Sequence, residues 1–317
     1  MSQAQAQDLG LEEEAPYYAP PADLPAPLPT TDEIKNATDI IADDNGHPKV
    51  VCVGPYVIKY GRGVDLYEGK NMMFVEQATT TGAVRLPRVY AFFEDAADEC
   101  TYIIMEKIQG QTLKALWPSL DDARKDRICR QIKASVTELR AMPSPTGGYC
   151  APGNRPLRVG LYPDVGPVDT EAEFNDALLE HFLRTKGGYK ALDPSDPMFA
   201  MLARHLPTLD ESLKKHSWAA NWFRRQFSAV FRDHPPTFAH GDLKPENIMV
   251  DPQNNDMVTL IDWRKAGWYP SYWEYFPAVM GCTNFYNTDW DEWLDRVLVP
   301  YPNEYVWQMF LWCNMYN

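Results

Sequence analysis

Short apolar runs broken by turn residues dominate the first third of the chain and predict a small sheet. Residues 50–53 and 56–60 are two such runs, and Gly54-Pro55 between them is typical of a hairpin turn. Residues 88–93 and 101–105 predict two more strands, separated by an acidic turn. Between the strand pairs, residues 65–78 carry apolar side chains at helical spacing. We therefore expect a small α+β unit in which two strand pairs enclose one helix.

The rest of the chain follows a mainly helical pattern. Ser119-x-x-Asp122 is a candidate capping box, and it opens a segment with one apolar helical face. Residues 143–167 are rich in Pro and Gly and predict a long irregular loop, which either lines a site or is a loose insertion. Further helices are expected over residues 31–42, 171–184, 198–205, 219–231, 289–299 and 304–316.

The N-terminal 30 residues have a different composition. They are polar, acidic at Glu12-Glu13-Glu14 and rich in Pro from residue 16 onward, so we expect a disordered arm. The 317 residues are enough for two lobes that share a cleft. We assign residues 31–107 to a β-rich N-lobe that binds nucleotide, and residues 108–317 to a helical C-lobe that carries the catalytic loop and the substrate site.

Composition and charge exclude several classes of protein. A hydrophobic content of 45% excludes a disordered chain, and a net charge of −14 disfavours nucleic acid or an anionic membrane as a partner. A small molecule, cationic or neutral, fits this charge better. The six cysteines show no metal-binding spacing, so free thiols in a reducing compartment are expected. Neither a transmembrane run nor a secretory signal is visible, which predicts a cytoplasmic protein.

The candidate chemistry lies in one polar loop between two apolar strands. The loop carries Asp242 and Asn247, and a third apolar strand soon ends at Asp262. Two carboxylates and a carboxamide at neighbouring strand ends suit phosphoryl transfer that depends on magnesium. One acid can take the proton of an attacking hydroxyl, while the other acid and the amide hold the metal on a triphosphate.

These residues also carry a family resemblance. His240-Gly-Asp-Leu-Lys-Pro-Glu-Asn247, together with Ile261-Asp-Trp263, resembles the catalytic core of the aminoglycoside phosphotransferase and choline kinase family. Ala266-Gly-Trp-Tyr-Pro270 and Tyr272-Trp-Glu-Tyr275 are similar to segments of its fungal members. The resemblance spans about residues 45–317. It implies a two-lobed, protein-kinase-like fold and a kinase that uses ATP and Mg²⁺ to phosphorylate a hydroxyl of a small molecule.

The resemblance also implies roles for residues of the N-lobe and the linker. Lys59 matches the strand lysine that contacts the ATP phosphates, and Glu68 matches the helix acid that pairs with it. Glu76 is a rival for that pairing, but the acid of the family opens this helix, which favours Glu68. Adenine would meet backbone groups of the linker at Glu106 and Ile108.

In the C-lobe the resemblance makes Asp242 the catalytic base and places Mg²⁺ on Asn247 and Asp262. Lys244 either approaches the γ-phosphate or is an ordinary solvated loop lysine. His240 is expected to anchor the loop.

Departures from the protein-kinase pattern narrow the class. No G-x-G-x-x-G precedes Lys59, Gly241 replaces an arginine of protein kinases, and Trp263 follows Asp262 in place of Phe-Gly. The last two features favour a small-molecule kinase over a regulated protein kinase. The missing glycine loop leaves a second possibility open, namely a kinase-like pseudoenzyme or binding module, or a fold recruited to another reaction.

The acceptor is not specified by the sequence. Acids near the C-terminus interleave with tryptophans, as in Asp289-Trp-Asp-Glu-Trp293 and Asp295. With Trp268, Tyr272 and Trp273 they would form an acidic, aromatic pocket for a cationic amine. The alternative is an ordinary helix with a solvated acidic face and a packed aromatic face. Aminoglycosides, choline-like amines, sugars and a specialised metabolite all stay open, and the sequence predicts no oligomeric state.

Overall fold

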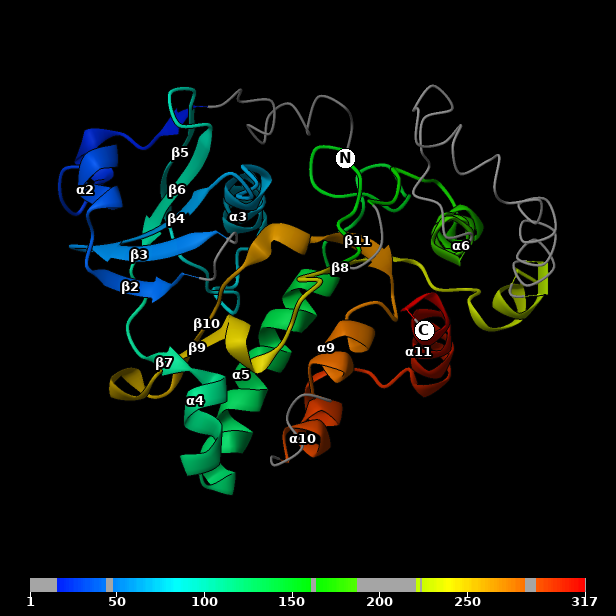
Figure 1. The fold of residues 1–317 in the computed structure, drawn as a ribbon. Coiled ribbons are helices and arrows are strands. Elements are labelled where there is room, and N and C mark those ends of the chain that lie inside the picture. Colours follow the sequence, from blue (N-terminus) through cyan, green and yellow to red (C-terminus); the bar gives the residue numbers. More distant parts are fainter. Residues whose placement is uncertain are drawn as a thin grey trace.

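An antiparallel sheet of six strands organises the first third of the protein in its computed structural model, which describes residues 16–43, 48–160, 164–186, 221–222, 224–282 and 289–316. The spatial order of the strands is β1-β5-β6-β4-β3-β2 (Figure 1). Their bounds are β1 Tyr17–Tyr18, β2 Asp39–Ala42, β3 Lys49–Val53, β4 Tyr56–Gly61, β5 Val89–Asp95 and β6 Cys100–Glu106. The predicted strands and the tight turn at Gly54, where φ is +56°, are confirmed.

Both faces of this sheet are covered by other parts of the chain. Successive side chains along a strand point to opposite faces, so neighbouring residues belong to different apolar clusters. Ile103 of β6 packs with Met72 and Val75 of helix α3 (Tyr67–Ala78), as predicted for the helix. Its neighbour Ile104 belongs to a second apolar cluster on the other face, with Ile34 of the short helix α2. Figure 1 shows α2 and α3 on opposite sides of the sheet.

The prediction of a disordered arm is wrong for residues 16–30. β1 pairs with the edge strand β5, Ala19 donates its N–H to the carbonyl of Tyr90 at 2.7 Å, and Arg88 forms an ion pair with Asp23. The prolines do not prevent this, because the segment lies at the edge of the sheet, where few backbone donors are needed. The remainder of the predicted arm, residues 1–15, lies outside the described residues.

The helix expected over residues 31–42 is shorter in the structure. α2 covers Thr31–Lys35, and a capping box between Thr30 and Glu33 opens it. The chain then turns into β2, in which Ile40 pairs with Val51 of β3 and the β-branched Ile41 lies at an irregularity in the register.

The remaining described residues are mainly helical around short strands. α5 is the long central helix in Figure 1, and its apolar side, which includes Ile128, Ile132 and Leu139, is buried. Its N-cap is Asp121, which accepts the Arg124 N–H at 2.8 Å; Ser119 instead donates to the Leu116 carbonyl, so the predicted capping box is wrong. The bounds are α4 Leu113–Leu116, α5 Asp122–Arg140, α6 Glu171–Lys186, α9 Tyr275–Cys282, α10 Trp290–Val297, α11 Pro302–Tyr316, β7 Gln111–Thr112, β8 Pro236–Ala239, β9 Ile248–Asp251, β10 Met257–Leu260 and β11 Gly267–Pro270.

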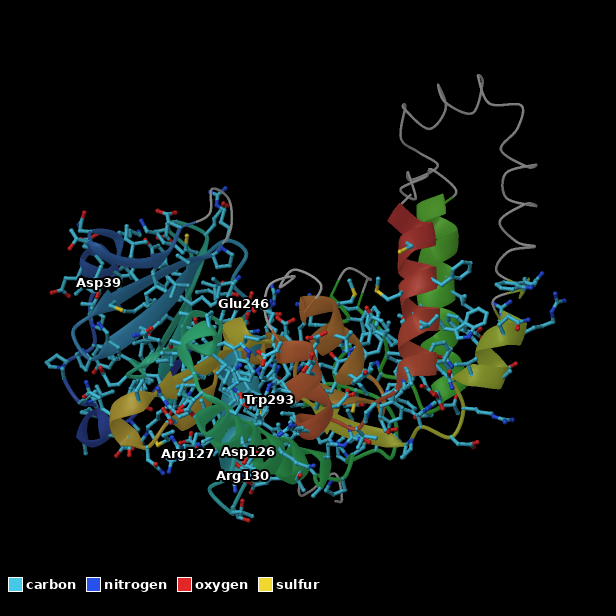
Figure 2. The ribbon with its side chains drawn as sticks, turned by 90° about the horizontal axis from the view of Figure 1, so that it is seen from below. Asp39, Asp126, Arg127, Arg130, Glu246 and Trp293 are labelled. Atoms are coloured by element: carbon cyan, nitrogen blue, oxygen red, sulfur yellow. The ribbon has the colours of Figure 1, made fainter. Side chains whose placement is uncertain are left out.

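Two contacts place the strand that leads to the polar loop. β8 pairs with β11. Just before β8, His234 contacts two helices and links them. Its Nδ1 lies 2.7 Å from Glu171 of α6, and its Nε2 lies 3.3 Å from Glu304 of α11. Figure 2 shows these helices side by side. The predicted helix at residues 198–205 lies outside the described residues.

In its described residues, 143–160 and 164–167, the Pro- and Gly-rich stretch is a packed loop and not a loose insertion. Tyr149 pairs with Val168, and Leu157 pairs with Val165 across it. Both Tyr149 and Leu157 are buried in an apolar cluster with Phe174 of α6. None of the described helices is long and apolar enough to cross a membrane.

Candidate active site

Lys59 of β4 joins helix α3 to a segment about 200 residues further along the chain. Its Nζ lies 2.6 Å from Oε2 of Glu68 on α3 and 3.3 Å from Oδ1 of Asp262, which follows β10. Glu68 is almost fully buried, and a buried charge requires a partner of this kind. Glu76, the rival for the pairing, is exposed and does not contact Lys59. The structure therefore brings Lys59, Glu68 and Asp262 together.

Electrostatics favour the charged forms of Lys59 and Asp262, whereas burial raises the pKa of Glu68 even though Lys59 acts to lower it. Burial lowers the pKa of Lys59, but Glu68 and Asp262 outweigh burial, so the pKa lies above its ordinary value. Burial raises the pKa of Asp262, yet Lys59 reverses the effect and the net pKa is lowered. Asp262 also has a left-handed backbone, with φ 65° and ψ 65°, an unusual conformation that clusters at functional sites.

Asp242 is held between two lysines. Lys265 Nζ lies 3.0 Å from one carboxylate oxygen, and Lys244 Nζ lies 3.1 Å from the other. Burial alone would raise the pKa of Asp242, but the two ammonium groups, with Lys265 the stronger, lower it to about 2. The carboxylate is therefore ionised at neutral pH. The Asp242 and Asp262 charges also lie close enough to influence each other.

Asn247 is oriented by Asp242. Its Nδ2 donates to the Asp242 backbone carbonyl at 2.9 Å and to the carboxylate at 3.1 Å. Asn247 is buried, and no described residue donates to its Oδ1. The amide oxygen is therefore left available for a ligand.

One buried acid holds the backbone of the loop. The carboxylate of Glu274 accepts N–H groups from His240 at 2.6 Å, from Gly241 at 3.1 Å and from Leu243 at 3.3 Å. The sequence predicted no role for Glu274. A signal existed, because an acid within the aromatic run Tyr272-Trp-Glu-Tyr275 is expected to be buried and hydrogen-bonded.

His240 anchors the loop from its other side. Its Nε2 lies 3.0 Å from the carbonyl of Ile261, and its Nδ1 accepts the Asp242 N–H at 3.3 Å. The ring packs edge-on against Trp263, with centroids 4.6 Å apart. His240 therefore links the loop to the strand end that carries Asp262.

The close approach of two backbones explains Gly241. Its φ is +78°, and a Cβ at this position would lie 2.5 Å from the carbonyl oxygen of Lys265. No side chain fits there, so the arginine of protein kinases is excluded by geometry.

A second contact ties α3 to the segment after Asp262. Asn71 lies one turn beyond Glu68, is fully buried and donates from Nδ2 to the Trp263 carbonyl at 2.9 Å. Its Oδ1 accepts from Arg155 at 2.8 Å, and this guanidinium also lies 3.7 Å above the ring of Tyr67. Burial lowers the pKa of Arg155 to about 10. Sequence reasoning missed Asn71, Arg155 and Lys265, because only the fold brings them to the site.

The linker residues do not join this cluster. Glu106 and Ile108 line a separate groove of about 620 Å³ with Glu76, Arg85 and Asp251, and neither Lys59 nor Asp262 lines it. Backbone groups are the atoms that matter for the predicted adenine contact. Among the described residues no group is hydrogen-bonded to the Ile108 N–H, so that donor is available.

The acidic, aromatic pocket is contradicted, and the ordinary helix is confirmed. Asp289 is engaged by Lys125 at 2.8 Å and by the indole N–H groups of Trp117 and Trp293. Trp290 packs edge-on against Trp117 in the core. The other acids of α10, Asp291, Glu292 and Asp295, lie on its exposed face. The aromatic residues that were expected to form the pocket wall are buried in the apolar clusters: Trp268, Tyr272, Trp273, Trp290 and Trp293.

Asn247 and Asp262 have the donor chemistry that Mg²⁺ requires. Both offer hard oxygen atoms, the Asn247 Oδ1 and the Asp262 carboxylate. In the part of the chain that the structure describes, no group of three or more His, Cys, Asp and Glu side chains is arranged to hold a metal. A two-ligand set still fits, because Mg²⁺ commonly binds through one or two carboxylates and completes its shell with phosphates and water.

Most of the chain matches a known protein family. Residues 68–308 match the model of a family described as "Phosphotransferase enzyme family". No curated protein matches the chain.

The solved structures that share the fold include two of one aminoglycoside phosphotransferase. The crystal structure of aminoglycoside phosphotransferase APH(4)-Ia is 16% identical, has a TM-score of 0.51 and covers 88% of this chain and 85% of its own. A thermostable mutant of that enzyme, in a ternary complex with AMP-PNP and hygromycin B, is 16% identical, has a TM-score of 0.52 and covers 88% of this chain and 86% of its own. The predicted fold, a β-rich N-lobe and a larger helical C-lobe of protein-kinase-like type, is confirmed.

Proposed function

The chain belongs to the phosphotransferase enzyme family, and from this premise we propose that it is a kinase that uses ATP and Mg²⁺ to phosphorylate a hydroxyl of a small molecule. The observation that carries the proposal is the convergence of Lys59 of β4, Asp242 of the polar loop and Asp262 after β10 in one charged cluster. We propose that the lobes meet at residues 107 and 108, so that the cluster lies between them.

Asp242 is the proposed catalytic base. Its low pKa makes it a weak base, but it also keeps the carboxylate ionised and able to orient an acceptor hydroxyl. In a loose phosphoryl-transfer transition state the proton leaves late, so orientation matters more than basicity. The proton of the acceptor hydroxyl would pass to an Asp242 oxygen as the acceptor oxygen bonds to the γ-phosphorus and the bond from that phosphorus to the β–γ bridging oxygen breaks, which releases ADP.

Lys59 and Lys244 are the proposed contacts to the nucleotide phosphates. Glu68 holds Lys59 in place, since the pair is 2.6 Å apart and mostly shielded from water. Lys244 contacts Asp242 in the structure, and a bound γ-phosphate would offer its ammonium a more highly charged partner. The backbone carbonyl of Glu106 and the free N–H of Ile108 are proposed to bind adenine.

Asn247 and Asp262 are proposed to hold Mg²⁺ through Oδ1 and the carboxylate. When bound, this ion neutralises the charge that develops on the transferring phosphoryl group. The hydrogen bonds from Asn247 Nδ2 to Asp242 fix the amide so that its oxygen is the atom presented to the metal.

The test is an ATP-consumption screen over aminoglycosides, choline-like amines and sugars, in which a product gains the mass of one phosphate. Asp242→Asn should lower turnover by about 10²–10⁴-fold, the usual contribution of a positioned base. Glu292→Gln, on the exposed face of α10, is the matched control and should leave turnover unchanged. Unaltered turnover in Asp242→Asn would refute the assignment. If millimolar Mg-ATP does not stabilise the wild-type protein, the alternative of a kinase-like binding module is favoured.

A further inference from the structure

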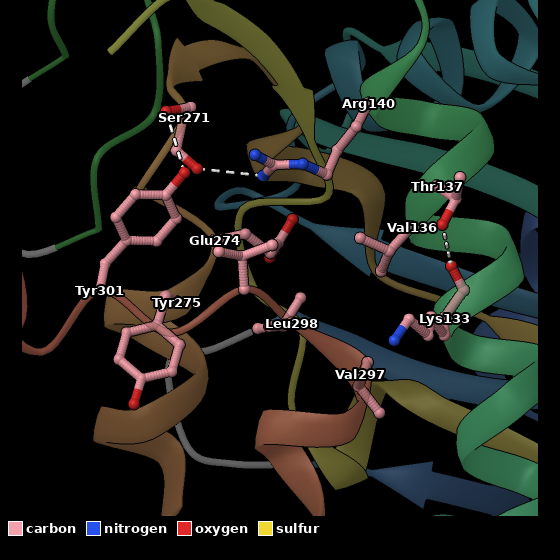
Figure 3. Close-up of a pocket in the computed structure, with 11 residues that line it drawn as sticks. Lys133, Val136, Thr137, Arg140, Ser271, Glu274, Tyr275, Val297, Leu298 and Tyr301 are labelled. Atoms are coloured by element: carbon pink, nitrogen blue, oxygen red, sulfur yellow. Dashed lines mark hydrogen bonds between the residues drawn. The ribbon is translucent and has the colours of Figure 1, made fainter. Parts of the chain in front are cut away.

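A cavity of about 200 Å³ lies between α5, the turn at residues 271–275 and the segment after α10 (Figure 3). Its walls are largely apolar and include Val136, Tyr275, Val297 and Leu298. A cavity of this size accepts one small ring, since a cavity of about 150 Å³ engineered in another protein binds benzene. The cavity is separate from the cluster around Asp242, and none of the residues assigned above to ATP or Mg²⁺ lines it.

Two cationic side chains extend over the cavity from one side. Lys133 and Arg140 are seven residues apart on α5, about two helical turns, and Figure 3 shows both reaching towards the opposite wall. No described residue pairs with the Lys133 ammonium. The described partner of the Arg140 guanidinium is the Ser271 carbonyl, 3.0 Å from Nη1, so its other N–H groups stay available.

None of the described residues that line the cavity offers a free carboxylate to Lys133 or Arg140. Among the described residues that line it, Glu274 is the one acid, and backbone N–H groups of the loop at residues 240–243 engage both of its oxygens. On a protein with a net charge of −14, a positive mouth over an apolar cavity selects for an anion with a small apolar body.

We propose that this cavity binds a small organic carboxylate that bears a single ring or a short branched chain. The planar guanidinium of Arg140 matches a carboxylate through two parallel hydrogen bonds, and Lys133 adds a second positive charge. The apolar body packs between Val136 and Leu298. The cavity volume excludes larger anions such as nucleotides.

The position of the cavity couples the bound carboxylate to the catalytic loop. Arg140 contacts Ser271, which shares a turn with Glu274, and Glu274 both lines the cavity and holds the loop. A carboxylate that recruits Arg140 competes with the Ser271 carbonyl and packs against the turn. Its binding therefore changes how firmly Glu274 holds the backbone that carries Asp242, and the coupling acts in both directions.

Titration calorimetry with benzoate tests the binding, and it needs neither ATP nor an acceptor, so its outcome is independent of the proposed reaction. We expect a Kd of about 1 mM or lower. Benzamide, the neutral isostere, should bind roughly tenfold more weakly, as should benzoate to Arg140→Gln. Lys133→Gln, at the exposed mouth, should weaken benzoate about threefold.

Arg130→Gln is the matched control, because it removes the same charge from α5 at a position that does not line the cavity. Figure 2 shows Arg130 with Asp126, its ion-pair partner. Benzoate affinity should be unchanged in this variant. Absence of benzoate binding, or equal affinity in wild type, Arg140→Gln and Lys133→Gln, would overturn the site.

Hydrogen exchange of the amides of His240, Gly241 and Leu243 tests the coupling. Saturating benzoate should change their exchange rates by about fivefold or more in the wild type. The same concentration should leave them unchanged in Arg140→Gln. Unchanged rates in a wild-type protein that binds benzoate would overturn the coupling.

Discussion

Glu274→Gln isolates the contribution of one side chain to the catalytic loop. The Glu274 carboxylate accepts three backbone N–H groups with two oxygens, and it is fully buried. Glutamine has nearly the same shape, but one of its two terminal groups is an NH₂, which is a donor. At least one of the three loop amides then faces a donor and loses its partner.

The expected cost follows from these contacts. A buried amide left without a partner costs roughly 1–3 kcal/mol, and the remaining bonds lose the charge that strengthens them, which adds about 1 kcal/mol or more. We expect the free energy of unfolding to fall by about 2–4 kcal/mol, a large part of the ~5–15 kcal/mol typical of a folded domain.

Urea unfolding at pH 7, followed by far-UV circular dichroism, measures this loss. Hydrogen exchange at residues 240–243 should accelerate in the variant, because these amides lose their acceptor. Glu292→Gln makes the same chemical change on an exposed face and should stay within about 0.5 kcal/mol of the wild type. An equally small effect of Glu274→Gln, with unchanged amide exchange, would refute the role that we assign to this carboxylate.

Three further predictions concern other parts of the protein. Lys59→Met should abolish the stabilisation of about 2.7 kcal/mol that Mg-ATP at 100 times its Kd gives the wild type, as measured by thermal shift; an undiminished shift would contradict the phosphate role. Gly241→Ala should destabilise the protein by more than Gly82→Ala in urea unfolding, because both positions have φ near +75° but only at Gly241 does a backbone oxygen lie 2.5 Å from the new Cβ. His234 has a raised pKa, since Glu171 and Glu304 outweigh the lowering caused by burial. Its contribution to stability is therefore complete below the unfolded value of 6.5 and lost as pH rises through the folded pKa. The stability difference between wild type and His234→Gln should shrink above pH 6.5, and a difference that grows with pH would be inconsistent with these ion pairs.

The sequence predicts local elements of this fold well, since hydrophobic period and turn residues are local signals. The strands around Lys59 and the helix that carries Glu68 follow from such patterns. Helix starts follow less directly from sequence, because several polar residues near a start have side chains that can cap it, and in α5 the cap is Asp121 and not Ser119. The composition of residues 16–30 is typical of a disordered segment. In the fold, however, they pair with the edge strand β5 and pack against the apolar cluster that includes Ile34.

The residues of the candidate site also fall into two groups, those that a local motif predicts and those that only the fold brings to the site. Asp242, Asn247 and Asp262 share a compact motif, whereas Lys265, Asn71 and Glu274 act through contacts that only the folded chain creates. The prediction of an acidic, aromatic pocket is wrong for a physical reason. Trp290 and Trp293 of α10 bury their rings in the apolar core, and Asp289 accepts the indole N–H groups of Trp293 and of Trp117, which precedes α5. Amphipathic helices bring acids and aromatics close in sequence while sending them to opposite faces.

The two-residue strand β1 has a consequence for how the protein can be shortened. It is the outermost strand, and it covers Ala91 and Phe92 of β5, whose edge would otherwise be open. An uncovered edge with apolar residues is a template for pairing with another molecule. Removing residues 1–30 would therefore leave the edge of β5 unpaired and open to intermolecular strand pairing. The shortened protein would aggregate even if its active site were intact. A cut that keeps Pro16 onward retains the cover.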